Sequence, residues 1–446
     1  MKFLYADSLD FVDPNYNFLE DRSTSGRETY WDDEFAHQYL GKAPFDGLLV
    51  SRGVVGDHKF SGKYTQSQAM RFRRVGVRKF MRLEDEQYAN LMLMGDCGAF
   101  SYKDMDKPPY SPTEILEFYE DAGFTHGCSV DHLIFDFERS LKGMESLPNR
   151  EDSLRVKERF DITIENAEAF YKESAHILNF MPMGVVQGWS PGSMAEAARR
   201  LVGIGYDYLA IGGMVPLNAE SIKFAISAIR ELIPDYVRIH ILGFGKIDNF
   251  KEFEPFNITS IDTTSPMLRA FKDSRKNFFM PGSGGKMKYY TAIRIPQATV
   301  NRGLTTLVKK GHFTQEFLLQ QEREALAAVR ELNQGKVTVE NALGPIMAFT
   351  KSHLVNPGTG ENVSDLKLNN IETDYRETLT DKPWQKCSCG VCEKVSVEGA
   401  IFRASNRNKR RGIHNMWIFH QQLKKLTGQE YQHEHAEIHS NSRATK

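Results

Sequence analysis

Long apolar runs are the clearest absence in this sequence. No stretch approaches the roughly eighteen apolar residues that a membrane-spanning helix needs, so we expect no membrane segment. The chain start, from Met1 to Asp7, becomes polar too early for a secretory signal peptide. Cysteine is also scarce, with 5 in 446 residues. Together these absences predict a cytoplasmic protein in a reducing compartment.

A strong excess of one charge is missing as well. The formal net charge is -1, so a nucleic-acid partner must be met by a local basic patch and not by the overall charge. With 41% hydrophobic and 26% charged residues, the chain can bury a full core and does not resemble a disordered protein. The length suits one large α/β barrel with an appendage, or two medium domains.

The few cysteines are unevenly placed. Cys387, Cys389 and Cys392 fall within six residues, and His414 follows after a basic connection. Three thiolates and one imidazole fill a tetrahedral zinc shell, with His420 as the only rival for the fourth position. The alternative is a cluster of reactive or buried thiols, but cysteines rarely gather in this way by composition alone.

Short apolar runs recur along the first 262 residues, and helical patterns lie between several of them. Strands that alternate with helices indicate a parallel sheet, and nearly continuous apolar strands favour a (β/α)₈ TIM barrel over an open sheet. The eighth strand is not assigned. The seven predicted strands are Gly47–Val50, Leu91–Met94, Leu133–Phe135, Met183–Val186, Tyr208–Ile211, Ile239–Leu242 and Ile258–Ile261.

Polar residues follow most of these strands. In a TIM barrel the carboxyl ends of the strands face the active site. Asp96, Asp136, Gln187 and Asp262 stand at such ends, as do the glycine pair Gly212-Gly213 and others. Each could be an ordinary turn residue. Three carboxylates aimed at one pocket would nevertheless repel each other unless the pocket used them.

Composition also divides the chain. We predict an N-terminal cover (1–43), the main part of the barrel (44–268), a region with a basic loop, remaining barrel elements and the zinc-binding subdomain (269–427), and a polar tail (428–446). The tail contains His433, His435 and His439, for which we expect a frayed end and no metal site.

A basic segment opens the third region. Residues 269–310 contain ten Lys or Arg and one acid, with aromatic residues between them. Cations among aromatics suit a nucleic-acid strand, so Arg275, Lys276, Lys286 and Lys288 are candidate contacts; an ordinary solvated surface is the alternative. A second basic run, 403–411, lies between the zinc cysteines and His414.

Several motifs together resemble the tRNA-guanine transglycosylases. The segment from Met94 to Phe100 resembles the family's Asp-Ser-Gly-Gly-Phe signature, with Cys97 and Ala99 as departures. The zinc spacing and the position of Asp262 are also similar to the family's. Further matches are Gly184-Val185-Val186-Gln187-Gly188 with Gly-Ile-Val-Gln-Gly, Ile211-Gly212-Gly213-Met214 with Leu-Gly-Gly-Leu, and Leu242-Gly243-Phe244-Gly245 with Met-Gly-Val-Gly.

This resemblance implies a base exchange. An aspartate attacks C1′ of a guanosine, guanine leaves, and a 7-deazaguanine takes its place with retention at the sugar. Asp262 matches the family's nucleophile and Asp96 its general acid/base. The zinc ion, on three thiolates and one imidazole, is implied to be structural.

The resemblance also implies a base pocket. Asp136 matches the carboxylate that accepts hydrogen bonds from the base's N1 and exocyclic amine. Gln187 and the backbone of Gly213 match the groups that bind the carbonyl edge, within the Gly212-Gly213-Met214 loop. Phe100 and Leu242 match the residues that sandwich the base, with Leu242 in place of the usual Met.

Departures from the family narrow the expected substrate. Asn218 stands in a loop where bacterial tRNA enzymes have a glutamate for an aminomethyl base, so a neutral nitrile fits better. The chain most resembles the DNA-modifying paralogue from 7-deazaguanine DNA-modification gene clusters. We therefore expect insertion of 7-cyano-7-deazaguanine into DNA, in a defence system with possible partner proteins. The alternatives are the same exchange on tRNA, or a non-catalytic zinc-bearing partner subunit.

Overall fold

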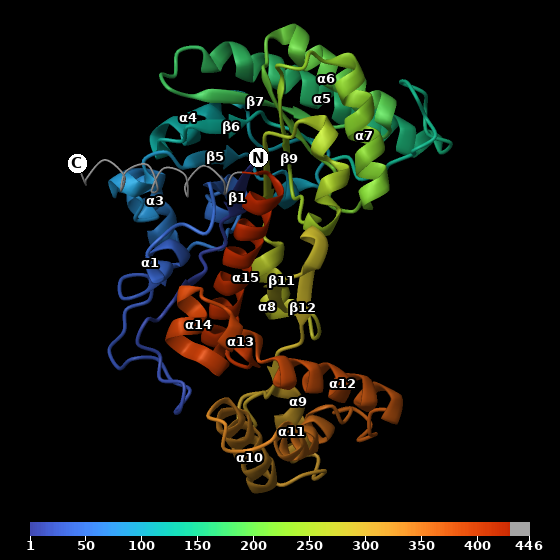
Figure 1. Cartoon of the computed structure of the whole chain (residues 1–446). Helices are drawn as coiled ribbons and strands as arrows, with labels where there is room; N and C mark the ends of the chain where they lie inside the picture. Colours follow the sequence, from blue (N-terminus) through green and yellow to red (C-terminus); the bar gives the residue numbers. More distant parts are fainter. Residues whose placement is uncertain (429–446) are drawn as a thin grey trace, which may run out of the picture. The chain divides into compact units, whose positions relative to one another are not determined.

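The computed structural model describes residues 1–428 (Figure 1). The predicted tail, with His433, His435 and His439, lies outside the described residues except for Gly428. Across residues 1–428, no helix has the length and apolar character required to cross a membrane.

The chain forms two compact units. Of the described residues, the first unit comprises Met1–Leu9, Phe45–Thr264 and 423–428, and the second comprises Asp10–Pro44 and Ser265–Gln422. The segment that we predicted as an N-terminal cover is therefore divided between the two units, because its first residues enter the barrel.

Eight parallel strands close into a barrel in the first unit, which confirms the predicted TIM-barrel class (Figure 1). Their order around the barrel is β1-β10-β9-β8-β7-β6-β5-β4. The strands are β1 (Lys2–Ala6), β4 (Gly47–Ser51), β5 (Met92–Asp96), β6 (His126–Cys128), β7 (Met181–Val186), β8 (Tyr208–Ile211), β9 (Arg238–Ile241) and β10 (Ser260–Thr263). The main helices between them are α3 (Gln66–Phe80), α4 (Pro112–Ala122), α5 (Arg150–Ser174), α6 (Pro191–Ile204) and α7 (Ala219–Leu232).

The unassigned eighth strand is β1, at the very start of the chain. It pairs with β10 on one side, where Leu4 is opposite Asp262, and with β4 on the other, where Tyr5 is opposite Leu48. Phe3 and Leu4 are fully buried. Only five residues form this strand, and an acidic, aromatic segment follows it, so the sequence pattern gave no strand signal there.

The third predicted strand, Leu133–Phe135, is wrong. The barrel strand at this point is β6, seven residues earlier, and Leu133–Phe135 lies in the loop after it. A Cβ on Gly127 of β6 would lie 2.4 Å from the ring of Tyr119, so close packing of α4 requires glycine here. The strand is consequently short of apolar residues, and the apolar run in the loop was mistaken for it.

Capping residues mark both ends of the barrel helix α4. At the start of α4, Ser111 accepts a hydrogen bond from the backbone N–H of Glu114, whose side chain returns to Ser111, and Pro112 occupies the first turn. At its end, Gly123 takes a left-handed conformation with φ of 69°. These caps hold α4 where its Tyr119 covers β6.

Apolar side chains fill the barrel interior below the site. Because side chains two residues apart share a face of a strand, Asp96 follows Met92 and Met94 into the interior, and Asp262 follows Ser260. The carboxylates therefore stand at the end of a packed core. Its members are Leu4, Leu49, Met92, Met94, Cys128, Met183, Val185, Tyr208 and Ala210.

The second unit combines a short N-terminal segment with a mostly helical region. Two antiparallel strands, β11 (Phe278–Pro281) and β12 (Met287–Tyr290), form a hairpin in it. The other elements are β2 (Phe11–Val12), β3 (Glu34–Phe35), α1 (Ala36–Leu40), α8 (Ser265–Lys272), β13 (Ile293–Arg294), α9 (Arg302–Lys309), α10 (Gln315–Asn333), α11 (Val339–His353), α12 (Asp365–Asp381), α13 (Pro383–Lys386), α14 (Gly390–Val395), β14 (Ile401–Phe402) and α15 (Ser405–Leu426).

The second basic run is a buried ionic core and not a surface patch. Arg407 is fully buried and forms ion pairs with Asp21 and with Glu398, the latter at 2.7 Å. Arg403 also pairs with Asp21, at 2.5 Å, and with Glu322. Cations at the start of α15 thus join the N-terminal segment to the helices within this unit.

We expect Arg407→Leu to lower the free energy of unfolding by about 3 kcal/mol, because Asp21 and Glu398 each lose one of the two cations that pair with them in a buried site. Arg376, which forms exposed pairs with Glu340 and Glu372, provides the matched control. Arg376→Leu should cost about 1 kcal/mol or less. Denaturant titration of both variants measures the difference. Equal losses would contradict a structural role for the buried pairs.

Candidate active site and metal centre

Three carboxylates gather at the carboxyl end of the barrel. Asp96 ends β5, Asp262 lies on β10, and Asp131 follows β6. All three act on the buried thiol of Cys128: burial raises its pKa well above the ordinary value, and the charges of the three carboxylates raise it further. The predicted meeting of Asp96 with Asp262 is therefore present in the structure, and Asp131 completes the group.

The side chain of Asp262 is held through one oxygen. Its Oδ1 accepts hydrogen bonds from His240 Nε2 at 3.0 Å and from the backbone N–H of Gly243 at 2.9 Å. Within residues 1–428, Oδ2 receives no hydrogen bond. The carboxylate is only 6% exposed. One oxygen of the carboxylate is thus anchored by two donors, and the other is not.

The environment of Asp96 favours the protonated form of its carboxyl group. Burial is the main cause that raises the pKa of its carboxyl group, and the charge of Asp262 adds to the shift. Hydrogen bonds from the Ser51 side chain and from the backbone N–H of Gly98, the latter at 3.1 Å, oppose it. A carboxyl group with a raised pKa can act as a general acid near neutral pH.

The carboxylate beside Gln187 is Asp131 and not the predicted Asp136. Gln187 Nε2 donates to Asp131 Oδ2 at 2.7 Å, and Cys97 Sγ donates to Oδ1 at 3.1 Å. Asp136 is half-exposed and pairs with Arg155 at 3.2 Å. Because β6 ends at Cys128, Asp136 lies eight residues beyond the strand. Residues 127–134, which include Asp131, are all buried, although the strand ends at Cys128.

Burial, and next the charge of Asp96, raise the pKa of Asp131 to about 6. The hydrogen bonds from Cys97 and Gln187 act in the opposite direction. Cys97, a departure from the family signature, is therefore placed to bind this carboxylate. Tyr102 lies in the same cluster, where its hydroxyl donates to the backbone carbonyl of Asp131 at 3.0 Å.

The glycine pair after β8 makes room for Gln187. A Cβ on Gly212 would lie 2.3 Å from Gln187 Nε2, and one on Gly213, whose φ is 72°, would lie 2.9 Å from the carbonyl oxygen of Ile134. Met214, next in the loop, is 2% exposed. A side chain at Gly212 would therefore push Gln187 away from Asp131.

Two exposed rings lie together in the segments that follow β5 and β6. Phe100 is 56% exposed, Phe135 is 37% exposed, and their ring centroids are 5.8 Å apart. Leu242, the predicted partner of Phe100, is partly buried against the barrel core. The sequence analysis named Phe100 as a candidate but not Phe135, since it placed Phe135 in a strand.

The predicted nucleic-acid contacts differ in their charge environment. Arg275 pairs with Asp374, and Lys288 pairs with Asp381 at 2.9 Å and with Glu377 at 3.2 Å. All three carboxylates are on α12. In the described part of the chain, Lys276 and Lys286 have no such carboxylate partner. They line a surface cavity of about 400 Å³ beside the β11-β12 hairpin.

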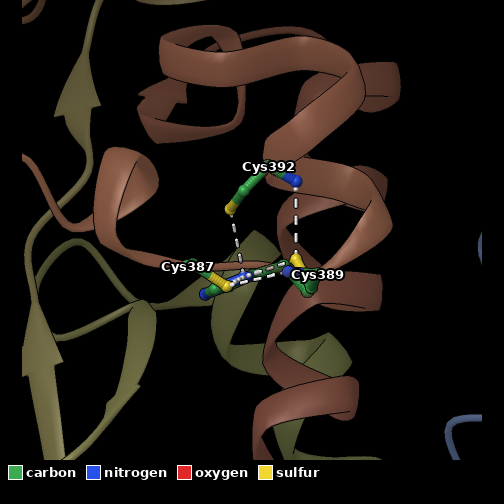
Figure 2. Close-up of side chains that lie close together, drawn as sticks. Cys387, Cys389 and Cys392 are labelled. Atoms are coloured by element: carbon green, nitrogen blue, oxygen red, sulfur yellow. Dashed lines mark hydrogen bonds between the residues drawn. The ribbon is translucent and has the colours of Figure 1, made fainter.

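Cys387, Cys389, Cys392 and His414 form one cluster in the second unit (Figure 2). Their four ligand atoms lie within 4.8 Å of one another, and His414 Nδ1 is 3.6, 3.3 and 3.4 Å from the three sulfurs in chain order. This spacing fits a tetrahedral ion with three sulfur ligands and one nitrogen ligand. The group could therefore hold a metal, as predicted, with His414 in the fourth position.

Backbone groups orient these ligands. His414 Nε2 donates to the carbonyl of Phe279 at 2.7 Å, which leaves Nδ1 unprotonated and available as a ligand. The sulfurs of Cys387 and Cys389 accept backbone N–H groups of Cys389 and Cys392, each at 3.4 Å. Such N–H donors stabilise thiolates, so the site is prepared for a cation.

Comparison with known proteins decides the family. No protein-family model matches the chain. A curated protein of Salmonella montevideo, described as "DNA-guanine transglycosylase", is 34% identical over 424 residues, which cover 95% of this chain and 96% of the relative. The chain belongs to the DNA-guanine transglycosylase family. It is therefore an enzyme, a glycosyltransferase of the pentosyltransferase class, as the resemblance implied.

The raised pKa of Asp131 makes the transglycosylase less stable as the pH rises. Its carboxyl group favours folding below the ordinary pKa of 3.8, and that contribution is lost as the pH rises through about 6. Relative to the parent, we expect Asp131→Asn to gain up to about 3 kcal/mol of unfolding free energy between pH 4 and pH 7.5.

Urea titrations across this pH range measure the gain. Asp136→Asn is the matched control, because Asp136 is half-exposed and paired with Arg155. A pH-independent difference for Asp131→Asn would contradict the assignment.

Proposed function

We propose that this transglycosylase replaces guanine in DNA with 7-cyano-7-deazaguanine through a covalent bond between Asp262 and the sugar. The arrangement of Asp262 and Asp96 carries the proposal. One carboxylate has an anchored oxygen and a free oxygen, and it faces a second carboxyl group whose pKa is raised. Retention at a sugar carbon requires such a pair, with a nucleophile and a proton carrier.

In the first step, Asp262 Oδ2 donates an electron pair to C1′ as the C1′–N9 bond breaks. The electrons of that bond go to guanine, and Asp96 transfers its proton to the leaving base. In the second step, the incoming base loses its N9 proton to the Asp96 carboxylate. Its nitrogen then attacks C1′, and the bond to Asp262 breaks. Both carboxyl groups return to their initial states.

Asp131 and Gln187 are the groups proposed to recognise the base. Guanine and 7-deazaguanine present two donors on one edge, N1–H and the exocyclic amine, and a carboxylate accepts both. Gln187 Nε2 donates one of its two hydrogens to Asp131. Its other hydrogen and the backbone N–H of Gly213 remain as donors for the base carbonyl. Phe100, Phe135 and Leu242 supply apolar surface for the ring. Asp131 thus takes the role first predicted for Asp136.

The neutral loop after β8 favours a nitrile at position 7. Asn218 is the N-cap of α7 and accepts a hydrogen bond from the backbone N–H of Ser221 at 2.8 Å, so its side chain serves the helix. Glu220, the first carboxylate after it, pairs with Arg139 at 3.0 Å. An aminomethyl base would bring a cation here without a free carboxylate to balance it.

DNA is proposed as the polymer because the relative that spans nearly the whole chain is described as a DNA-guanine transglycosylase. Within the basic segment, Lys276 and Lys286 are the cations best placed to meet phosphates, since Arg275 and Lys288 are already paired. A role in a DNA-modification defence system with partner proteins rests on the same resemblance.

The function is tested by incubating the protein with DNA or tRNA and radiolabelled 7-cyano-7-deazaguanine. DNA, and not tRNA, should gain the label. Without a second base, denaturing gels should show a covalent protein–DNA species, and Asp262→Asn should abolish it because an amide is a poor nucleophile. Asp96→Asn should slow its formation by about 10²–10⁴-fold. Label in tRNA alone would keep the chemistry and reject the polymer, and an adduct in Asp262→Asn would overturn the roles.

Zinc is the proposed metal at the Cys387 cluster, where it would have a structural role. Three thiolates and one imidazole leave no open position, so the ion would supply folding energy and no chemistry. Its apparent binding energy is typically about 10 kcal/mol or more.

We expect Cys389→Ser to give metal-free protein of low solubility, whereas Cys97→Ser should retain one zinc per chain. Elemental analysis of the purified proteins measures the metal. Fully active Cys389→Ser protein without zinc would contradict a structural ion.

A further inference from the structure

A chain of buried hydrogen bonds lies behind Asp262. Tyr208 Oη and Ser260 Oγ are 2.6 Å apart, and Ser260 Oγ and His240 Nδ1 are also 2.6 Å apart. His240 Nε2 then reaches Asp262 Oδ1 at 3.0 Å. The residues come from the neighbouring strands β8, β9 and β10, and none of Tyr208, Ser260 and His240 is more than 2% exposed. Neither base recognition nor proton transfer, as proposed above, uses these three residues.

The direction of each bond follows from its partners. A carboxylate only accepts, so His240 carries a proton on Nε2. In a neutral imidazole Nδ1 then accepts, so the hydroxyl of Ser260 donates to it and Tyr208 donates to Ser260. Burial raises the pKa of Tyr208 to about 12, so its phenol remains a donor. The chain therefore selects one tautomer of His240 and fixes its ring.

The consequence appears at Asp262. Both of its donors, His240 and the backbone of Gly243, bind Oδ1, so the carboxylate cannot rotate without losing two hydrogen bonds. Gly243 has φ of 71°, and a Cβ there would lie 2.6 Å from the Val215 side chain. The turn that presents this N–H is thus restricted to glycine. The donors on either side of Oδ1 leave Oδ2 as the reactive oxygen.

We propose that His240, held by Ser260 and Tyr208, is a positioning residue that directs Oδ2 of Asp262 at the sugar carbon. This inference rests on the proposed aspartyl intermediate. His240 is fully buried among the strands, so it acts through Asp262 and not on the substrate. An apolar residue would pack the barrel wall without a buried polar network. The network is explained by the orientation that it imposes on the nucleophile.

The test measures how fast the protein–DNA adduct forms in a single turnover, and the DNA concentration that gives half the maximal rate. We expect His240→Leu to lower the maximal rate by about 100-fold, the typical effect of a 1 Å misplacement. The half-saturating DNA concentration should change by less than about twofold, because binding surfaces are untouched. His240→Gln restores an N–H donor to Asp262, so it should form the adduct about tenfold faster than His240→Leu.

A matched pair of tyrosine variants separates positioning from stability. Tyr208→Phe removes the first donor of the chain and should slow adduct formation by about three- to tenfold. Tyr206→Phe is the control, because the Tyr206 hydroxyl is equally buried but donates to the carbonyl of Ala167 at 2.7 Å. It should form the adduct at the parental rate, although thermal unfolding should show a similar loss of stability in both variants.

The outcomes distinguish this inference from the proposed function. If the parent forms the adduct and His240→Leu forms it equally fast, the positioning role is overturned and the proposed function stands. If His240→Leu does not fold, parental rates in both His240→Gln and Tyr208→Phe overturn the role instead. A change in half-saturating DNA concentration at an unchanged maximal rate would also overturn it. If the parent forms no adduct with DNA, both proposals fall.

Discussion

The cost of burying negative charge at the carboxyl end of the barrel governs the rest of the site. Asp96, Asp131 and Asp262 share a region of low dielectric, where the charge of Asp262 raises the pKa of Asp96 and the charge of Asp96 raises the pKa of Asp131. The three are distinguished by their donors. Asp96 and Asp131 have raised pKa values, whereas Asp262 accepts hydrogen bonds from an imidazole and a backbone N–H. On the proposed mechanism, these different environments separate a proton carrier from a nucleophile.

Glycine makes this distribution of donors possible. The backbone N–H that binds Asp96 belongs to Gly98, with φ of 89°, and the one that binds Asp262 belongs to Gly243, with φ of 71°. In both turns a left-handed residue brings an N–H back to a carboxylate. A Cβ on Gly98 would lie 2.6 Å from the backbone nitrogen of Gly53. Backbone conformation therefore accounts for these glycines.

Sequence reasoning reached the fold class, the metal cluster and the approach of Asp96 to Asp262, because each follows from local order: apolar runs, ligand spacing, and residues at strand ends. It failed where the identity of a strand or a site residue depends on packing between residues that are far apart in the sequence. Gly127 is demanded by the ring of Tyr119, so β6 has no apolar signature and Asp131 was overlooked in favour of Asp136. The contact between His240 and Asp262 could not be predicted for the same reason, because it depends on the register between β9 and β10.

In the second unit, the free charge of the basic segment also depends on residues that are distant in the sequence. Residues 269–310 are strongly basic in sequence, yet Asp374 and Asp381 on α12 neutralise Arg275 and Lys288. Selection of the polymer must then depend on the remaining cations and on the sugar. On the proposed mechanism the base pocket reads an edge of guanine that DNA and RNA share, so it cannot choose between them. Deoxyribose lacks the 2′-hydroxyl that withdraws electrons from C1′, and its glycosidic bond breaks more readily. A site that acts on DNA therefore needs a smaller rate contribution from its general acid. It also needs surfaces close enough to the sugar to exclude a 2′-hydroxyl.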